Sequence, residues 1–161
     1  MTEIRFSAER FVDAPADIVY HCIADYVRHH RPDGFLPPAF TDMEVERGGV
    51  GSGTVVHFTV TAMGRSERHH ATVSEPQPGR VLVETEEKNA LRTTFSVEPH
   101  GSQSRVRFDT VYSRSGVMGW IEKLLVARVL GPLYADELRR LEQHAQAHGP
   151  LSACPGASGA G

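Results

Sequence analysis

The stretch Thr54–Val73, TVVHFTVTAMGRSERHHATV, decides the fold, because it holds two alternating runs joined by Met63-Gly64. Apolar residues stand at even positions in the first run and at odd positions in the second. A two-residue turn pairs residues whose numbers sum to 127, so Phe58 faces His69. Even-numbered residues of the first run then lie opposite odd-numbered residues of the second, so the apolar residues of both runs share one face. This hairpin predicts one apolar face and one solvated face.

Short alternating runs of the same kind, separated by Gly and Pro turns, extend over most of the chain. A tight turn near His100-Gly101 pairs Phe95 and Val97 with Val106 and Ser104, which again places apolar residues on one face. We predict seven antiparallel strands: Ile4–Val12, Met43–Arg47, Thr54–Thr61, Arg65–Glu75, Val81–Glu86, Leu91–Glu98 and Arg105–Tyr112.

Helical spacing occurs in two places. Residues 13–30 follow the first strand, with Pro15 suited to a first helical position, and residues 31–34 contain stop signals. Val117–Ala147 is a long amphipathic pattern, in which Gly131-Pro132 predicts a kink or a break. We therefore predict an α+β fold with a short helical segment after the first strand. The seven-stranded sheet curls around the long C-terminal helix.

Composition and charge narrow the function. The chain has 161 residues and a net charge of -3, which fits one domain and argues against a nucleic-acid-binding surface. Its first residues carry charge and no apolar run is long enough for membrane insertion, so we expect a cytoplasmic protein. Cys22 and Cys154 are expected to be reduced thiols. Nine histidines are the one compositional oddity.

The order of these elements resembles the START-like, helix-grip superfamily, also labelled SRPBCC, which includes the Bet v 1 allergens and the polyketide cyclase/dehydrase proteins. The similarity covers residues 1 to about 145 and rests on the order and spacing of several short stretches. These stretches are Phe11–Val19, Gly49–Thr54, Val73–Pro76, Pro78–Arg80 and Leu138–Leu141. We expect residues 1–148 to form this domain and 149–161 to be a flexible tail.

The resemblance implies a helix-grip fold with two short helices after the first strand. It also implies a deep cavity between the curved sheet and the long helix, which family members use for sterols, lipids, plant hormones and polyketides. Some members are cyclases or aromatases, and others are carriers or sensors. The family has no universal catalytic residues, so none can be transferred to this chain. The resemblance implies a monomer or a homodimer.

The register places a candidate acid-base pair on the apolar face. His69 shares that face with Phe58, and Glu67 lies two residues earlier, where its carboxylate would orient the imidazole or else be hydrated at the rim. His69 is either a hydrogen-bonded core residue or a cavity base, and Tyr112 would steady a developing enolate.

Further cavity positions lie on the apolar face of the strands and on the long helical pattern. Polar candidates are usually structural, but tyrosine hydroxyls in apolar pockets also fix ligand oxygens. The candidate ligand contacts are Phe58, Val60, Ala71, Thr93, Phe95, Phe108, Thr110, Trp120, Leu124, Arg128 and Tyr134. Asp25, His29 and His30 end the first helical segment, where we expect a solvent-exposed charged helix end rather than a cavity entrance.

No metal or other cofactor is predicted. H-E-x-x-H spacing is missing, and His57 and His70 form only a solvated pair on the outer face. The loop GGVGSG (48–53) leads into a strand rather than a helix, which disfavours phosphate binding.

Three functions remain. The preferred one is a carrier or sensor for a hydrophobic, polyketide-, lipid- or aromatic-like small molecule. The first alternative is a cyclase or aromatase that uses the acid-base residues His69, Glu67 and Tyr112. The second alternative is a protein-interaction module.

Overall fold

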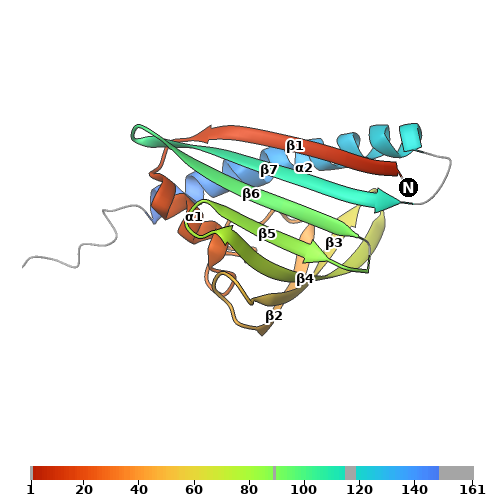
Figure 1. Ribbon diagram of the computed structural model, residues 1–161, viewed down its shortest axis with the longest axis horizontal. Coiled ribbons are helices and arrows are strands. Elements are labelled where there is room, and N and C mark those ends of the chain that lie inside the picture. The colour runs from red at the N-terminus through yellow and green to blue at the C-terminus, as the bar shows by residue number, and fades with distance from the viewer. Residues whose placement is uncertain (1, 89, 115–118, 149–161) are drawn as a thin grey trace, which may run out of the picture.

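The computed structural model describes residues 2–88, 90–114 and 119–148, with side chains for 3–88, 90–113 and 126–148. The predicted α+β helix-grip architecture is confirmed (Figure 1). The tail, 149–161, lies outside the described residues. The elements are β1 (Thr2–Val12), α1 (Ala16–Ala24), β2 (Phe40–Arg47), β3 (Val55–Ala62), β4 (Arg65–Gln77), β5 (Val81–Glu86), β6 (Leu91–His100), β7 (Gln103–Arg114) and α2 (Gly119–Ala147).

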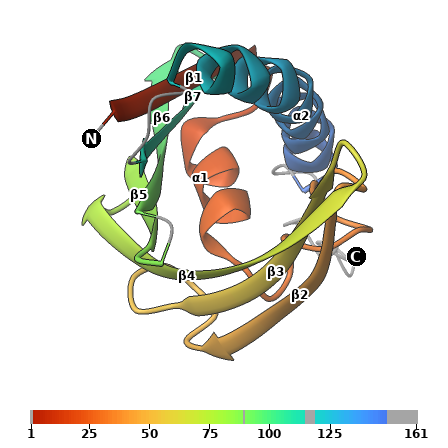
Figure 2. The same ribbon diagram turned by 90° about the vertical axis from the view of Figure 1, so that its right-hand side faces the viewer.

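The seven strands form one antiparallel sheet in the order β1-β7-β6-β5-β4-β3-β2. Figure 2 shows that this sheet curves through a wide arc, with α1 inside the curve and α2 along the open side between the edge strands β1 and β2. Because the sheet is strongly curved, its concave face and α2 together surround the interior.

The hairpin of β3 and β4 has the predicted register, with Phe58 opposite His69. Met63 and Gly64 have φ values of 52° and 74°, the left-handed pair that a tight hairpin turn requires. In the β6–β7 hairpin the predicted register is wrong by two residues, since Phe95 pairs with Phe108 because the turn closes at residues 100–103. A shift by two leaves each side chain on the same face.

Only one helix is described between β1 and β2, where two were predicted. α1 ends at Ala24 because the next backbone groups bond to the glycine loop: the Tyr26 N–H donates to the Gly49 carbonyl at 2.9 Å. Residues 26–35 continue as turns. They fold so tightly that a Cβ atom on Gly34 would lie 2.1 Å from the His29 carbonyl oxygen.

The long helix α2 is continuous through Pro132, so of the two predicted alternatives, a kink or a break, the break into two helices is wrong. Proline within a helix costs about 3 kcal/mol, because it removes a hydrogen bond and crowds the preceding turn. Burial of the turns that follow offsets this cost. Tyr134, Leu138, Leu141 and Ala145 repeat at helical spacing and are buried against the sheet and α1.

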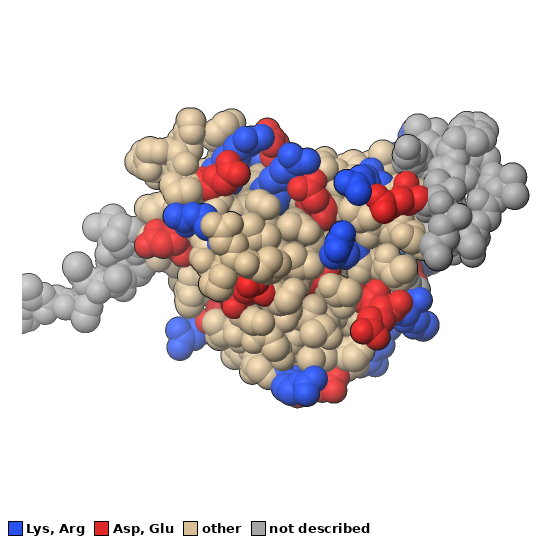
Figure 3. All heavy atoms as spheres, viewed as in Figure 1, with Lys and Arg blue, Asp and Glu red and all other residues tan. Residues whose placement is uncertain are grey.

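The outer face of the sheet carries acidic and basic residues side by side (Figure 3). Arg105 pairs with Glu9 at 2.8 Å, and Arg107 pairs with Asp109 at 2.8 Å. The first pair joins β7 to β1, and the second joins two residues of β7. Both pairs lie on the solvated face that the alternation predicts. No helix among the described residues is long and apolar enough to cross a membrane.

Candidate functional site

A cavity of about 300 Å³ lies between the concave face of the sheet and α2. Its wall is mostly apolar, with aromatic and aliphatic side chains from both layers. Eight of the residues predicted from the sequence line it: Phe58, Val60, His69, Thr93, Phe95, Thr110, Tyr112 and Tyr134.

Other predicted residues lie elsewhere. Ala71 and Phe108 are buried in the packed core and do not line the cavity. Glu67 is exposed on β4, and Arg128 is exposed on α2, where it borders a separate surface hollow. Trp120 and Leu124 lie outside the side chains that the structure describes.

His69 has a carboxylate partner, but not the one expected. Its Nδ1–H donates to Glu86 Oε2 at 2.7 Å, and the imidazole ring stacks on Phe58 with a centroid separation of 5.2 Å. Glu86 is buried at the end of β5. The proposed orienting role of Glu67 therefore passes to Glu86, which fixes the His69 ring so that it faces the cavity.

A second polar group comprises the carboxyls of Glu84 and Glu137, which line the cavity from β5 and α2. The Tyr26 hydroxyl donates to Glu84 Oε1 at 2.5 Å. Burial raises the pKa of Glu84 to about 7, even though the Tyr26 hydrogen bond lowers it. Burial, together with the nearby Glu84 carboxylate, raises the pKa of Glu137 to about 8. Glu137 is therefore largely protonated at neutral pH.

A chain of hydroxyl groups completes the polar wall. Thr93 and Thr110 form a hydrogen bond of 3.0 Å across β6 and β7, and Thr110 bonds to the Tyr134 hydroxyl at 2.5 Å. The Tyr134 ring packs edge-on against Phe108. Burial raises the pKa of Tyr134 above its usual range, so the phenol stays protonated. Thr93, Thr110 and Tyr134 thus tie the sheet to α2 and also line the cavity.

The segment after α1 is buried, which corrects the expectation of a solvent-exposed helix end. Asp25, His29 and His30 are only 2%, 6% and 3% exposed. The His30 Nε2–H donates to the Ile23 carbonyl at 2.7 Å, and the ring stacks on Tyr26. The turns of residues 26–35 fold the segment inward, so His30 lines the cavity.

Sequence reasoning missed the acidic residues of β5, although their spacing carried a signal. Leu82, Glu84 and Glu86 alternate with outward-facing residues, so both carboxylates share a face with a buried leucine. Ladder pairing of Val73 with Glu84 places them on the apolar face that the β3–β4 hairpin defines. Glu137 was not predicted to line the cavity, because several of its near neighbours in the sequence of α2 are also charged.

Two open hollows adjoin the cavity. One lies between α2 and the segment Pro37–Ala39, and it shares Val129 and Leu133 with the cavity wall. The other lies beside the ends of β4 and β5, and it shares His69. Ladder pairing between these strands ends at Thr72 and Thr85, so the His69–Glu86 pair spans the place where they separate.

A largely apolar cavity held between a curved antiparallel sheet and a C-terminal helix defines the START-like helix-grip class of domains. Residues 3–146 match the family described as "Polyketide cyclase / dehydrase and lipid transport". The match covers most of the chain, which therefore belongs to this family. A comparison with curated proteins found no significant match.

Solved structures show the same fold at low identity. The KanY protein, determined by NMR, is 24% identical with a TM-score of 0.78, and the match covers 91% of this chain and 99% of that one. The ZhuI aromatase/cyclase from Streptomyces sp. R1128 is 15% identical with a TM-score of 0.74, covering 91% and 96%. A START superfamily protein from Mycobacterium smegmatis is 19% identical with a TM-score of 0.70, covering 86% and 97%.

Proposed function

We propose that the protein binds a small, uncharged, largely apolar molecule carrying carbonyl or hydroxyl groups, and acts as its carrier or sensor. The single observation that carries this proposal is the cavity, whose apolar wall holds a few polar groups. Such a combination is typical of sites in which burial supplies affinity and a few hydrogen bonds supply orientation.

The polar groups favour a neutral ligand. Because the pKa of Glu137 is raised to about 8, its protonated carboxyl can donate a hydrogen bond to a ligand oxygen near neutral pH. Glu84 also lines the cavity, and its pKa of about 7 leaves a fraction of its carboxyl ionised near neutral pH, which would repel an anionic ligand. An oxygenated aromatic or polyketide-like molecule fits this arrangement better than a fatty acid.

The volume limits ligand size. A cavity of about 300 Å³ is at the small end of the usual range for ligand sites. A compact ring system therefore suits it better than a long-chain lipid. We infer that the ligand enters through the hollow beside Pro37–Ala39, since Val129 and Leu133 line both spaces.

Filling the cavity tests the binding proposal. Leu130 lines the cavity from α2, so Leu130→Trp should occupy space that a ligand needs. Phe11→Trp is the matched control, because Phe11 is exposed on β1 and away from the cavity. In a fluorescence titration with naphthol, we expect Leu130→Trp to weaken binding by at least about tenfold and Phe11→Trp to leave it unchanged. Equal affinity in both variants would reject the cavity as the binding site.

A second candidate function is cyclase- or dehydratase-type proton transfer, and the His69–Glu86 pair favours it. An imidazole held by a buried carboxylate can remove a proton from carbon next to a carbonyl group. Tyr112 also lines the cavity, where its hydroxyl would steady the enolate oxygen.

Deuterium exchange separates this candidate from binding alone. A neutral β-diketone in D₂O should exchange its α-protons faster with the protein present, as followed by NMR. His69→Ala should abolish this acceleration while leaving binding within about tenfold, because a general base acts in the reaction step. If exchange is accelerated equally by His69→Ala, His69 is not the base.

A further inference from the structure

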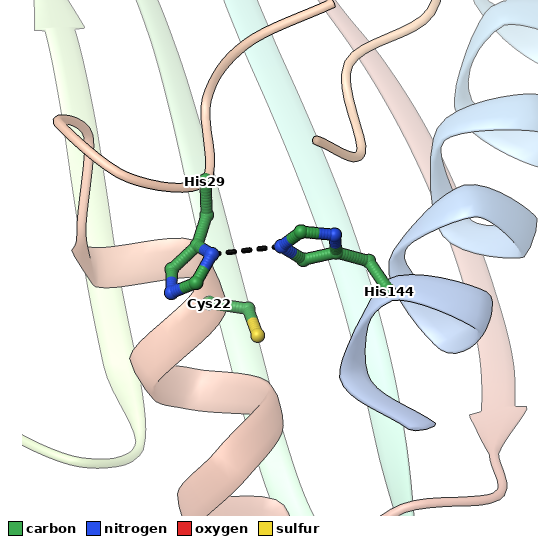
Figure 4. A group of neighbouring side chains, drawn as sticks. All are labelled: Cys22, His29 and His144. Carbon is green, nitrogen blue, oxygen red and sulfur yellow. Dashed lines mark hydrogen bonds between the residues drawn. The ribbon is translucent and has the colours of Figure 1, made fainter. Parts of the chain in front are cut away.

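Several of the nine histidines gather at one place outside the cavity. Four of the nine histidines, His21, His29, His144 and His148, lie together where the end of α1 meets the last turns of α2. Cys22 joins them from α1. Figure 4 shows Cys22, His29 and His144 gathered between the two helices.

Three of these side chains have the spacing of a metal site. One ligand atom each from Cys22, His29 and His144 lies within 4.8 Å of the others. His29 Nδ1 and His144 Nε2 are 2.7 Å apart, which is a hydrogen bond between two imidazoles (Figure 4). The three residues come from α1, from the turn after it and from α2, so tertiary packing brings them together.

Burial leaves the imidazoles ready to act as ligands. Cys22 and His29 are buried, and His144 is half-buried. In the contact between His29 Nδ1 and His144 Nε2, one of the two nitrogens accepts the hydrogen bond and so carries the lone pair that a metal ion needs. Coordination to a cation would release the proton of the buried Cys22 thiol, so that the ligand is the thiolate.

We propose that Cys22, His29 and His144 form a binding site for Zn²⁺. One thiolate and two imidazoles are donors that Zn²⁺ prefers, at about 2.3 Å for sulfur and 2.0–2.1 Å for nitrogen. Tetrahedral coordination separates two nitrogen ligands by roughly 3.3 Å. The imidazoles would therefore move apart by about half an ångström, giving up their mutual hydrogen bond for two metal bonds.

The fourth position faces the solvent side of the cluster. The exposed His148 ring lies there, with its centroid 4.2 Å from that of His144 and 5.2 Å from that of His29. His148 or a water molecule would complete the tetrahedron. On the other side, His29 shares a second group of neighbouring ligand atoms with His21 and the buried Asp25. Asp25 belongs to this second group and not to the proposed ligand set.

Sequence spacing gave no sign of this site, and no metal was predicted, because His29 and His144 are 115 residues apart. A bound ion would link α1 to the C-terminal turns of α2 and so fasten the helix across the sheet. A third group, Glu46, His57 and His70, is more exposed, belongs to the outer face and lacks a thiolate. Its histidines therefore serve as the matched control.

Cobalt spectroscopy and zinc calorimetry test the site in the full chain after chelator treatment. Co²⁺ should produce a thiolate-to-cobalt charge-transfer band together with the visible bands of tetrahedral coordination. We expect Cys22→Ser to abolish the charge-transfer band. Cys22→Ser and His144→Asn should each weaken Zn²⁺ binding by at least about 100-fold, since ligand loss exceeds the loss of an outer-shell partner. His57→Gln/His70→Gln should bind Zn²⁺ as the wild type does.

Other outcomes overturn the proposal. These are no Zn²⁺ uptake by the wild type, uptake unchanged in Cys22→Ser and His144→Asn, or uptake lost only in His57→Gln/His70→Gln. If Cys22→Ser does not fold, the proposal is tested by comparing the melting temperatures of the wild type and His144→Asn with and without Zn²⁺. Zn²⁺ should raise that temperature in the wild type and not in His144→Asn, because a ligand that binds only the folded state stabilises it.

Discussion

The buried carboxyls predict an unusual loss of stability above neutral pH. The pKa of Glu84 is about 7 and that of Glu137 is about 8, against 4.5 for an ordinary glutamate. A group whose pKa is raised on folding contributes stability that is fully present below its unfolded pKa and is lost as pH rises through its folded pKa. For these two carboxyls that window runs from about pH 4.5 to pH 8.

At lower pH, histidines change the folding stability in the opposite direction. The pKa of His30 and of His144 is lowered to about 4, so their contribution is present above pH 6.5 and is lost as pH falls. The carboxyl effect is therefore cleanest from pH 6.5 to 8.5. Over that interval deprotonation of the folded state should cost about 2 kcal/mol at Glu137 and about 1 kcal/mol at Glu84.

Urea denaturation at pH 6.5, 7.5 and 8.5 measures this loss. We expect the wild-type unfolding free energy to fall by about 3 kcal/mol over the interval, and that of Glu137→Gln by less than about 1 kcal/mol. The smaller fall follows because glutamine does not titrate and no longer repels Glu84. Glu87→Gln, an exposed residue after β5, should behave as the wild type. An equal fall in Glu137→Gln and the wild type would refute the reasoning.

Three substitutions test the fold by urea denaturation. Leu138→Ala removes a fully buried side chain of α2 and should cost about 2–5 kcal/mol, whereas a loss below 1 kcal/mol would mean that α2 does not pack as described. Gly64→Ala should cost about 1–2 kcal/mol, because Gly64 has a φ of 74° in open space; no loss would argue against the turn. Tyr134→Phe should cost about 1–2 kcal/mol by removing the bond to Thr110, and a neutral effect would show that this bond contributes nothing.

Sheet topology was predictable because the alternation of side chains and the length of the turns are local properties. Phe58 opposite His69 followed from Met63-Gly64 alone, since a two-residue turn fixes the register. The β6–β7 error of two residues did not alter any face, which is why Phe95 was still assigned to the cavity. Seven of the eight predicted residues that line the cavity came from this face assignment, and the eighth, Tyr134, lies on α2.

Residues brought together by tertiary packing were not predictable. His69 pairs with Glu86 on the next strand rather than with Glu67 on its own strand, and no local pattern selects between them. The burial of His29 and His30 depends on the turns after α1, which bond to the glycine loop about 25 residues later. Helical spacing continued past Ala24, but a long-range backbone pairing ended the helix there.

Ligand binding in the cavity is the central claim, and methyl NMR tests it most directly. Titration of methyl-labelled protein with naphthol should shift the signals of Val60, Leu91 and Leu130, which line the cavity. The exposed Val27 and Val50 should not shift. Saturable shifts confined to the cavity methyls would support the account. Shifts at Val27 or Val50 with none at the cavity methyls would contradict it.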